Sequence, residues 1–387
     1  MDMRPRKSSL AVTLFFLWIL VSLCSSGSAA AADDSSRLYM IKSSNGLYGF
    51  IDHQGNKIIP ARFTYARNFS EGLAAVQTAA SAKWGYIDPR GKFVIPPQFR
   101  QASDFSEGLA AVAFEPHGNI GYIDKSGKTV ILPVYQAGSP FHNGIARVQT
   151  STTVFIDKTG AILLETPYKE AWEVGSGLIA FLADSKLGFM DWQGKIIIEP
   201  KFNRIMYGRQ DLFKETITPV NAGPLKQNSW GFIDKTGKTV VNFDYDWAEQ
   251  YQDGMALVCK NKMHGFLDKD GRQVIALQFE DAWKFSEGLA AVKKNGLWGF
   301  IDKQGRWVIL PQYQGLLFGS PIEFHEGLAA VRTVNGTGYI NAAGEMVIAP
   351  IYRTADDFQN GIAEVHLFYG IKGYINQTGQ YIWLSNR

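Results

Sequence analysis

Histidine is the side chain that most often ligates metals or transfers protons near neutral pH. This 387-residue chain has six, and none stands at the spacing of an HExxH helix or of a comparable metal motif. Each lies at a position where neighbouring copies of an internal repeat carry unrelated residues. The six residues, which we interpret as loop residues, are His53, His117, His142, His264, His325 and His366.

An aspartate recurs through the chain in the pattern Asp-x-x-Gly. A calcium loop needs several oxygen ligands, whereas each copy supplies one carboxylate, in most copies beside a lysine. Asp at the first position and Gly at the fourth are typical of a type I turn closed by a left-handed residue. Asn341 and Asn376 replace the aspartate in the last two copies, and asparagine favours the same turn. We therefore predict structural turns, and the clearest copies pair Asp88 with Gly91, Asp234 with Gly237 and Asp302 with Gly305.

Other residue types that perform catalysis also lack a recognisable arrangement. The chain has no Gly-x-Ser-x-Gly motif, no phosphate-binding loop and no Cys-x-x-Cys pair. The glycines of Gly175-Ser176-Gly177 lack the following helix that a dinucleotide site requires. Cys259 ends an apolar run and is interpreted as a small buried hydrophobe. The sequence therefore predicts no catalytic residue, no metal and no cofactor.

Three tryptophans occupy repeat positions at which other copies carry small or polar residues. Trp172 and Trp283 share one position, and Trp247 stands two residues earlier in the register. Exposed aromatic side chains stack on sugars or anchor protein partners, although local packing would also account for each one singly. We predict that the three lie at least partly exposed along one side of the molecule, with the insertion at Gly315–Pro321 at its edge.

The elements that position these residues are ten copies of one unit. Its clearest copy runs from Trp298 to Ile309, with two β-favouring runs around an Asp-x-x-Gly turn, which predicts a hairpin. A second phrase, Phe-Ser-Glu-Gly-Leu-Ala-Ala-Val, is intact at Phe69–Val76, Phe105–Val112 and Phe285–Val292, and predicts a third strand. Between the two, an aromatic-Ala-aromatic spacing of three residues favours a single helical turn, as at Phe99–Phe105.

A fixed period of this kind indicates a repeat architecture. The predicted fold is an all-β, elongated or curved array of ten three-stranded units, each a hairpin with one strand and a short helical turn. Propeller-like closure is the alternative. It is less favoured because propellers usually have four to eight blades of four strands.

The N-terminal segment has the composition of a signal peptide. Arg4, Arg6 and Lys7 precede the short apolar run Leu10–Leu23, and small residues up to Ala32 suit a signal peptidase. The predicted organisation is therefore a signal peptide at 1–32, a linker at 33–37 and a repeat domain at 38–387. A membrane anchor, or lipidation at Cys24, are the alternatives. Cleavage removes three positive charges and one negative charge, so that the net charge of +3 becomes +1, which does not favour binding to nucleic acid.

The repeat resembles the WG-repeat family, also called KWG repeats, over roughly residues 38–383. The resemblance rests on Trp84-Gly85-Tyr86-Ile87-Asp88, Trp230-Gly231-Phe232-Ile233-Asp234 and Trp298-Gly299-Phe300-Ile301-Asp302, together with the Glu-Gly-Leu-Ala-Ala-Val phrases. It departs from the pattern at Phe155, which replaces the glycine. The family is mostly bacterial and, as the resemblance implies, offers no established catalytic residues to carry over.

Together these observations predict an exported, non-catalytic β-repeat protein. We expect a secreted location, or one in the bacterial periplasm or cell envelope, without an integral membrane anchor after cleavage. The expected role is to present a surface to a partner protein. Carbohydrate or cell-wall glycan binding through Trp172, Trp247 and Trp283 is the alternative. An enzyme, with a site in the insertions near Tyr207–Asp211 or Gly315–Pro321, is less favoured.

Overall fold

The computed structural model describes residues 37–203, 212–213, 215–223 and 229–385. Contacts divide the chain into Met1–Asp34 and Ser35–Arg387. The predicted signal peptide and the Tyr207–Asp211 insertion lie outside the described residues. In the described part of the chain, regular structure consists of strands and two short 3₁₀ turns, η2 (Leu317–Gly319) and η3 (Phe368–Gly370). None of its helices is long and apolar enough to cross a lipid bilayer.

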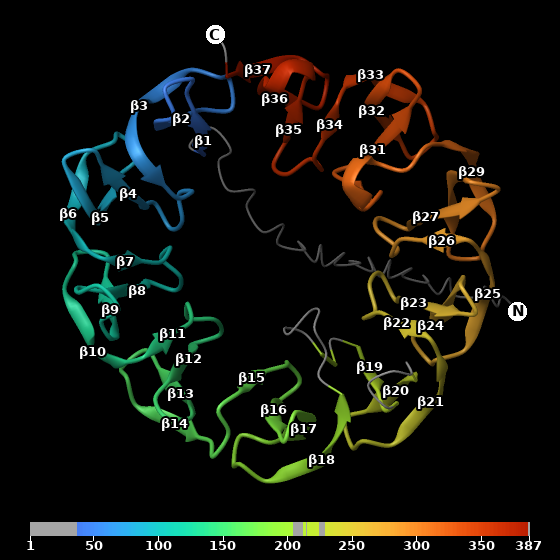
Figure 1. The fold of residues 1–387 in the computed structure, drawn as a ribbon, viewed down its shortest axis with the longest axis horizontal. Helices are drawn as coiled ribbons and strands as arrows, with labels where there is room; N and C mark the ends of the chain where they lie inside the picture. Colours follow the sequence, from blue (N-terminus) through green and yellow to red (C-terminus); the bar gives the residue numbers. More distant parts are fainter. Residues whose placement is uncertain (1–36, 204–211, 214, 224–228, 386–387) are drawn as a thin grey trace, which may run out of the picture. The chain divides into compact units, whose positions relative to one another are not determined.

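Within Ser35–Arg387, the described strands form nine antiparallel sheets that follow one another around a ring (Figure 1). The first sheet has six strands and holds two repeats: β1 (Tyr39–Lys42), β2 (Tyr48–Ile51), β3 (Lys57–Ala66), β4 (Ala74–Thr78), β5 (Ser81–Ile87) and β6 (Phe93–Phe99). The next three sheets have four strands each: β7 (Gln101–Ala102), β8 (Leu109–Ala113), β9 (Ile120–Asp124) and β10 (Thr129–Tyr135); β11 (Ala137–Gly138), β12 (Ile145–Gln149), β13 (Thr153–Asp157) and β14 (Ile162–Glu165); β15 (Ala171–Glu173), β16 (Ile179–Ala183), β17 (Lys186–Met190) and β18 (Ile196–Asn203).

The later sheets repeat the same order. One has three described strands, β19 (Ile217–Asn221), β20 (Trp230–Asp234) and β21 (Thr239–Tyr245). The last four have four strands each: β22 (Trp247–Ala248), β23 (Met255–Lys260), β24 (Met263–Asp268) and β25 (Gln273–Phe279); β26 (Asp281–Ala282), β27 (Leu289–Lys294), β28 (Leu297–Asp302) and β29 (Trp307–Tyr313); β30 (Phe324–His325), β31 (Leu328–Thr333), β32 (Gly336–Asn341) and β33 (Met346–Tyr352); β34 (Thr354–Ala355), β35 (Ile362–His366), β36 (Lys372–Asn376) and β37 (Tyr381–Leu384). We call the four strands of a sheet inner, second, third and outer, and the outer strands lie on the perimeter (Figure 1).

The aspartate turn joins the third strand to the outer strand of each repeat. Gly305 has a φ of +76°, and its N–H donates to the carbonyl oxygen of Asp302 at 2.9 Å. The Asp302 carboxylate accepts the N–H of Gln304 at 3.0 Å and that of Arg306 at 2.9 Å. The same arrangement holds the other turns singled out in the sequence, Asp88 with Gly91 and Asp234 with Gly237.

The glycine of each Trp-Gly pair is required for a different reason. Gly299 is on the third strand β28, where the outer strand β29 crosses it through a register shift. A Cβ on Gly299 would lie 2.5 Å from the carbonyl oxygen of Ile309 and 2.7 Å from the nitrogen of Pro311. Gly85 meets the outer strand of its own repeat in the same way, with 2.7 Å to the carbonyl oxygen of Ile95. A side chain here would therefore push the outer strand off the sheet.

The predicted helical turn is wrong. In its place lie a two-residue inner strand and a tight turn. Ala102 pairs with Val112, and the N–H of Ser103 donates to the carbonyl oxygen of Ala111 at 2.9 Å. Glu107 and the glycine after it then both have positive φ, as in a type I′ hairpin turn. The aromatic spacing of three arises because both aromatic side chains point into the core on either side of this strand. Most units therefore have four strands, not three.

The core lies between successive sheets. One buried cluster joins Tyr86, Ile95 and Phe99 of the first sheet to Ala110 and Val112 of the next. The small alanines of the second strand allow neighbouring sheets to approach closely, because a larger side chain would fill the space between them.

Polar contacts at the inner turns, which we call clasps, join several repeats to the next one. The Glu107 carboxylate accepts the N–H of Gly144 at 2.9 Å and lies 3.2 Å from the Lys158 ammonium group. Ser106 donates its hydroxyl to the carbonyl oxygen of Phe141 at 2.6 Å. Equivalent contacts recur at Glu71, Asp253, Glu287 and Glu326, which explains why the Ser-Glu-Gly phrase is repeated.

The array closes on itself, so the open-array prediction is wrong and the alternative, a β-propeller, is the fold. Third-strand tyrosines donate to a carbonyl of the following repeat, as Tyr86 does to Ser103 at 2.7 Å. Tyr374 of the last repeat donates in the same way to Met40 of the first, at 2.9 Å. Tyr39 donates to the carbonyl oxygen of Asn360 at 3.1 Å. The first repeat thus occupies the position of the repeat that would follow the tenth.

The two classes of glycine predict different sensitivities to alanine. The new Cβ of Gly305→Ala meets only the Ile275 side chain, at 3.4 Å. We therefore expect the free energy of unfolding to fall by about 1–2 kcal/mol, which is the cost of left-handed backbone at a residue with a Cβ. Gly299→Ala meets backbone at 2.5 Å, and we expect the free energy of unfolding to fall by about 3 kcal/mol or more. Urea unfolding of both variants measures the difference. Equal losses would show that the outer strand does not constrain Gly299.

The turn carboxylates predict a dependence of stability on pH. The hydrogen bond from the Thr236 hydroxyl, opposed by desolvation and assisted by the N–H groups of Thr236 and Lys238, holds the pKa of Asp234 below 3.8. Because the pKa is lowered in the folded state, this stabilisation is present above pH 3.8 and is lost as the pH falls through the folded pKa. Asp234→Asn keeps the acceptor but does not titrate. We expect its unfolding free energy to fall less than that of the wild type on acidification, with Asp184→Asn as the surface control.

Candidate functional site

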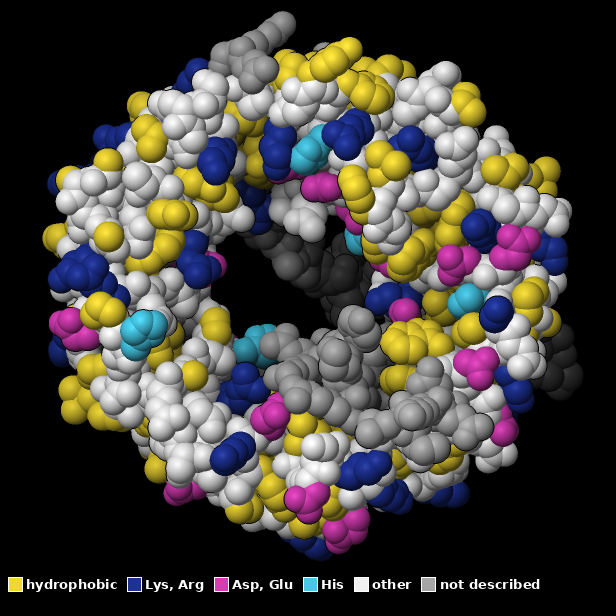
Figure 2. Space-filling model, viewed as in Figure 1, with side chains coloured by type: hydrophobic (Ala, Val, Ile, Leu, Met, Phe, Trp, Pro, Cys, Tyr) yellow, Lys and Arg dark blue, Asp and Glu magenta, His cyan; other side chains and the backbone are white. Residues whose placement is uncertain are grey.

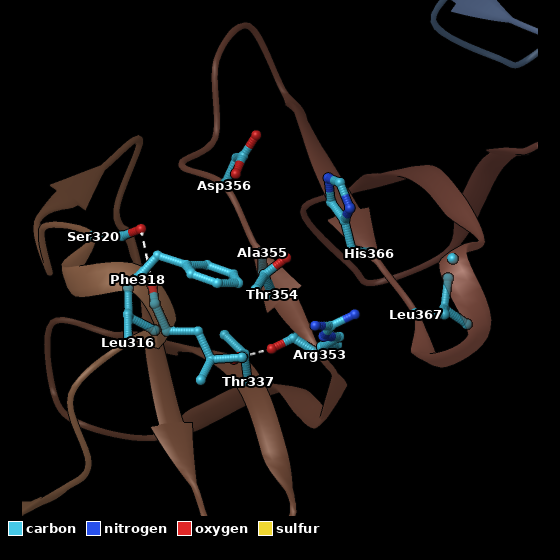
Figure 3. Close-up of a pocket in the computed structure, with 12 residues that line it drawn as sticks. Leu316, Phe318, Ser320, Thr337, Arg353, Thr354, Ala355, Asp356, His366 and Leu367 are labelled. Atoms are coloured by element: carbon cyan, nitrogen blue, oxygen red, sulfur yellow. Dashed lines mark hydrogen bonds between the residues drawn. The ribbon is translucent and has the colours of Figure 1, made fainter.

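A cavity with a volume of about 400 Å³ lies between the last two sheets. The insertion at Gly315–Pro321, which contains η2 and precedes the inner strand β30, forms one wall. The strand β34 and the connection after β35 form the other wall (Figure 3). Its lining residues are Leu316, Leu317, Phe318, Ser320, Thr337, Arg353, Thr354, Ala355, Asp356, His366, Leu367 and Gly370.

Phe318, which lines the cavity, and Tyr369, which precedes the lining residue Gly370, are exposed aromatic residues with left-handed backbone. Phe318 has a φ of +62° and is 86% exposed, and Tyr369 has a φ of +68° and is 99% exposed. Each is the middle residue of a 3₁₀ turn and is followed by a glycine with positive φ. Left-handed backbone at a bulky residue costs about 1–3 kcal/mol and is concentrated at functional sites. We call Phe318 and Tyr369 the rim aromatics.

The polar groups of the cavity lie at separate positions along it. Figure 3 shows the Phe318 ring extending towards Thr354 and Ala355, with Asp356 at one end and Arg353 nearer the other. Thr337 donates its hydroxyl to the carbonyl oxygen of Arg353 at 3.4 Å, which anchors the backbone beside the cavity.

Acidic and basic groups of β35 and β36 set the electrostatics behind the cavity. His366 Nε2 lies 3.0 Å from the Glu364 carboxylate, which also receives the Lys372 ammonium group at 2.8 Å. Desolvation, and after it the negative charge of Glu364, raise the pKa of Asp356, while His366 and Lys372 act in the opposite direction. The His366 ring is therefore held by a carboxylate. The cavity also presents the Asp356 carboxylate and the Arg353 guanidinium group, which forms no ion pair with the residues that the structure describes.

A second ionic group joins the same two sheets at their inner turns. His325 Nε2 lies 3.3 Å from a carboxylate oxygen of Asp357 and 3.6 Å from one of Glu323. Burial raises the pKa of Asp357, and the charge of His325 offsets part of this effect. Among the residues that the structure describes, no three His, Cys, Asp or Glu side chains are grouped so that they could hold a metal ion.

The three tryptophans singled out in the sequence do not form an exposed stripe. Trp172 is 5% exposed, so its predicted exposure is wrong: it belongs to a buried cluster that also contains Leu212 and Phe213. Trp247 is half-buried and lies 5.1 Å from the Trp230 ring, with its Nε1 3.4 Å from the Glu249 carboxylate.

Trp283 is also half-buried, stacked on Trp298 with 6.4 Å between ring centroids. The two rings are therefore part of the packing between an inner strand and a third strand. The sequence placed the insertion at Gly315–Pro321 at the edge of the predicted tryptophan stripe, but the rim aromatics were not predicted. Their signal was a bulky residue before glycine, in Phe318-Gly319 and Tyr369-Gly370.

The burial of these tryptophans predicts unequal losses on truncation. Trp172→Ala should lower the free energy of unfolding by about 3–5 kcal/mol, as for other buried aromatic residues. Trp283→Ala should cost about 1–2 kcal/mol, because part of its ring already contacts solvent. Chemical unfolding of the two variants checks this order. A larger loss for Trp283 than for Trp172 would contradict it.

Comparison with solved structures supports the fold. The chain is similar to a structure described as the crystal structure of the eukaryotic initiation factor, with a TM-score of 0.50 and 10% identity over 90% of this chain and 95% of that one. It overlaps less well with BamB from Moraxella catarrhalis, with a TM-score of 0.34 and 11% identity over 88% and 99% of the two chains. At such low identity, the likeness to the initiation factor concerns the fold alone.

The sequence comparisons identify the repeat. No curated protein matches the chain. The family model described as WG containing repeat matches eight segments, which together cover more than half of the chain: 48–78, 84–114, 120–151, 188–210, 230–263, 265–298, 298–337 and 338–365. The hairpins β13–β14 and β36–β37 lie outside these segments. By this match and by its repeated hairpins, the chain belongs to the WG containing repeat family.

Proposed function

We propose that this chain is an exported, non-catalytic β-propeller that binds a partner protein through the cavity and the rim aromatics. The observation that carries the proposal is the exposure of Phe318 and Tyr369 on left-handed backbone. An exposed apolar side chain is common on protein surfaces by itself. Two exposed aromatic side chains on strained backbone beside one cavity are typical of an interface, where aromatic residues anchor the partner.

The surroundings of the rim aromatics favour a protein as the ligand. Val334, in the connection between β31 and β32, is 86% exposed and lies three residues from the cavity residue Thr337. Phe368 beside Tyr369 is 52% exposed. Exposed apolar side chains are therefore also present in the connections next to the cavity residues, and a ligand that covers the rim as well as filling the hollow would bury them. A small molecule would leave most of them in water.

The rest of the molecule supports a scaffold role. On the face shown in Figure 2, Lys and Arg side chains are intermixed with Asp and Glu, and neither sign forms a continuous field. This pattern is unlike the basic surface that binds nucleic acid. The repeats are joined by the clasps at the inner turns, so that connections between strands can vary while the sheets stay fixed.

Export and the absence of catalysis are parts of the proposal that rest on the sequence. The basic residues before the apolar run Leu10–Leu23 and the small residues up to Ala32 support cleavage and a location outside the cytoplasm. At the cavity, His366 Nε2 lies 3.0 Å from the Glu364 carboxylate, so this nitrogen is engaged within the protein.

Affinity capture with matched variants tests the proposal. Mature protein is used to capture partners from the cell-envelope extract of the source organism, beside the double variant Phe318→Ser/Tyr369→Ser. The control is Leu132→Ser, which removes an exposed apolar side chain of β10 that is 69% exposed and distant in the ring. We expect a protein retained by the wild type and the control and lost, by tenfold or more, with the double variant.

Other outcomes would contradict the proposal. Retention of the same proteins by the double variant would show that the rim aromatics do not bind them. Selective retention of purified glycans on a glycan array, with no protein captured, would favour the carbohydrate alternative. Turnover of a captured protein would contradict the non-catalytic role.

A further inference from the structure

The guanidinium group of Arg353 is a positive charge at the cavity that makes no ion pair within the described residues. Arg353 follows β33 and precedes β34, and its N–H donates to the carbonyl oxygen of His366 at 2.8 Å. Its side chain is exposed and lines the cavity. Among the described residues, no carboxylate forms an ion pair with its guanidinium group.

Two other repeats carry an acid at the position equivalent to Arg353. Asp246 and Glu280 occupy it, because their N–H groups donate to a carbonyl oxygen near the end of the second strand, that of Cys259 at 2.9 Å and that of Lys293 at 3.0 Å. Their carboxylates then accept an N–H of the connection between the second and third strands: Asn261 to Asp246 at 2.6 Å, and Gly296 to Glu280 at 3.0 Å. The position thus directs a side chain towards that connection.

Arg353 has the opposite charge to Asp246 and Glu280 at this position. A guanidinium group has five N–H donors and no acceptor, so it cannot cap a backbone N–H as Asp246 and Glu280 do. In the last repeat the connection is Leu367–Ile371, which carries the rim aromatic Tyr369. Arg353 therefore lies beside exposed aromatic surface with its donors available to a ligand.

We propose that the cavity recognises an extended segment of a partner protein in which one carboxylate side chain stands next to a large apolar side chain. Arg353 binds the carboxylate through paired N–H donors, the geometry for which arginine is suited. The apolar neighbour packs against Phe318, Leu316 and Leu367. This inference rests on the proposed function and adds the chemistry of the partner.

Asp356 limits how acidic the segment is. It lines the same cavity, and Figure 3 places Thr354 and Ala355 between it and Arg353. A run of acidic residues would bring a second carboxylate towards Asp356, and two nearby carboxylates repel each other. The structure therefore favours a single acid flanked by apolar residues over an acidic stretch.

A phage-displayed library of random short peptides, selected on the folded wild-type protein, tests this chemistry. We expect enrichment of Asp or Glu beside an aromatic or large aliphatic residue. A selected peptide should lose about tenfold in affinity when its acid is replaced by the matching amide, as expected for a hydrogen bond to a charged group. Titration calorimetry measures both peptides.

Three variants localise the effect. Arg353→Gln should remove the difference between the acid and amide peptides, and Arg353→Lys should retain part of it. Arg100→Gln is the matched control, because Arg100 occupies the same position in another repeat, where its N–H donates to the carbonyl oxygen of Ala113 at 2.7 Å, and it does not line the cavity. It should leave the difference unchanged.

The inference is overturned if selection yields no acid, if no peptide is enriched, or if Arg353→Gln preserves the preference for the acid. These failures are distinguishable from failure of the proposed function. Loss of partner capture with Phe318→Ser/Tyr369→Ser would still support protein binding at the rim, and only the chemistry assigned to the partner would be wrong.

Discussion

The structure depends on the absence of one Cβ in nearly every repeat. At Gly299 the backbone of the outer strand passes where a side chain would stand, and Gly49, Gly85, Gly121, Gly231 and Gly265 are in the same position. The close crossing lets the outer strand bend across the third strand and return along the perimeter. Phe155 is an exception to this pattern, since it has a side chain at the glycine position. The outer strand of its repeat, β14, is short, and Leu164 of β14 pairs directly with Phe155. A side chain is accommodated there because the strand ends early.

The sequence predicts the parts of this fold that depend on contacts between residues close together in the chain, and not those that depend on contacts between repeats. The hairpins were predictable because Asp302, Gly305 and their equivalents form the turn through contacts within five residues. Closure was not, because it depends on a small rotation between neighbouring sheets that no single repeat reveals. The contact from Tyr374 to Met40 uses the same chemistry as that from Tyr86 to Ser103. An open array and a ring therefore share their local signals.

The candidate site was likewise predictable in part. The repeat length located the insertion at Gly315–Pro321, because ten aligned copies make an extra segment visible. The exposure of Phe318 was not predictable, since it arises from a backbone angle at one residue. Trp172 and Trp283 share a register position but differ in burial, because Trp172 joins a cluster with Leu212 and Phe213 from the following repeat. Equivalent positions in a repeat share backbone geometry and differ in what their neighbours contribute.

The seam between the last repeat and the first has a consequence for how such a protein changes over evolutionary time. An open solenoid gains or loses a repeat by duplication or deletion at either end, and each intermediate remains folded. A closed ring has no free end. Adding one unit here would separate Tyr374 from Met40 and Tyr39 from Asn360, so every other interface would have to rotate before the seam could reform. The copy number is thus held by ring geometry, and sequence divergence is directed into the connections between strands, where the insertion with η2 and the 3₁₀ turn η3 lie.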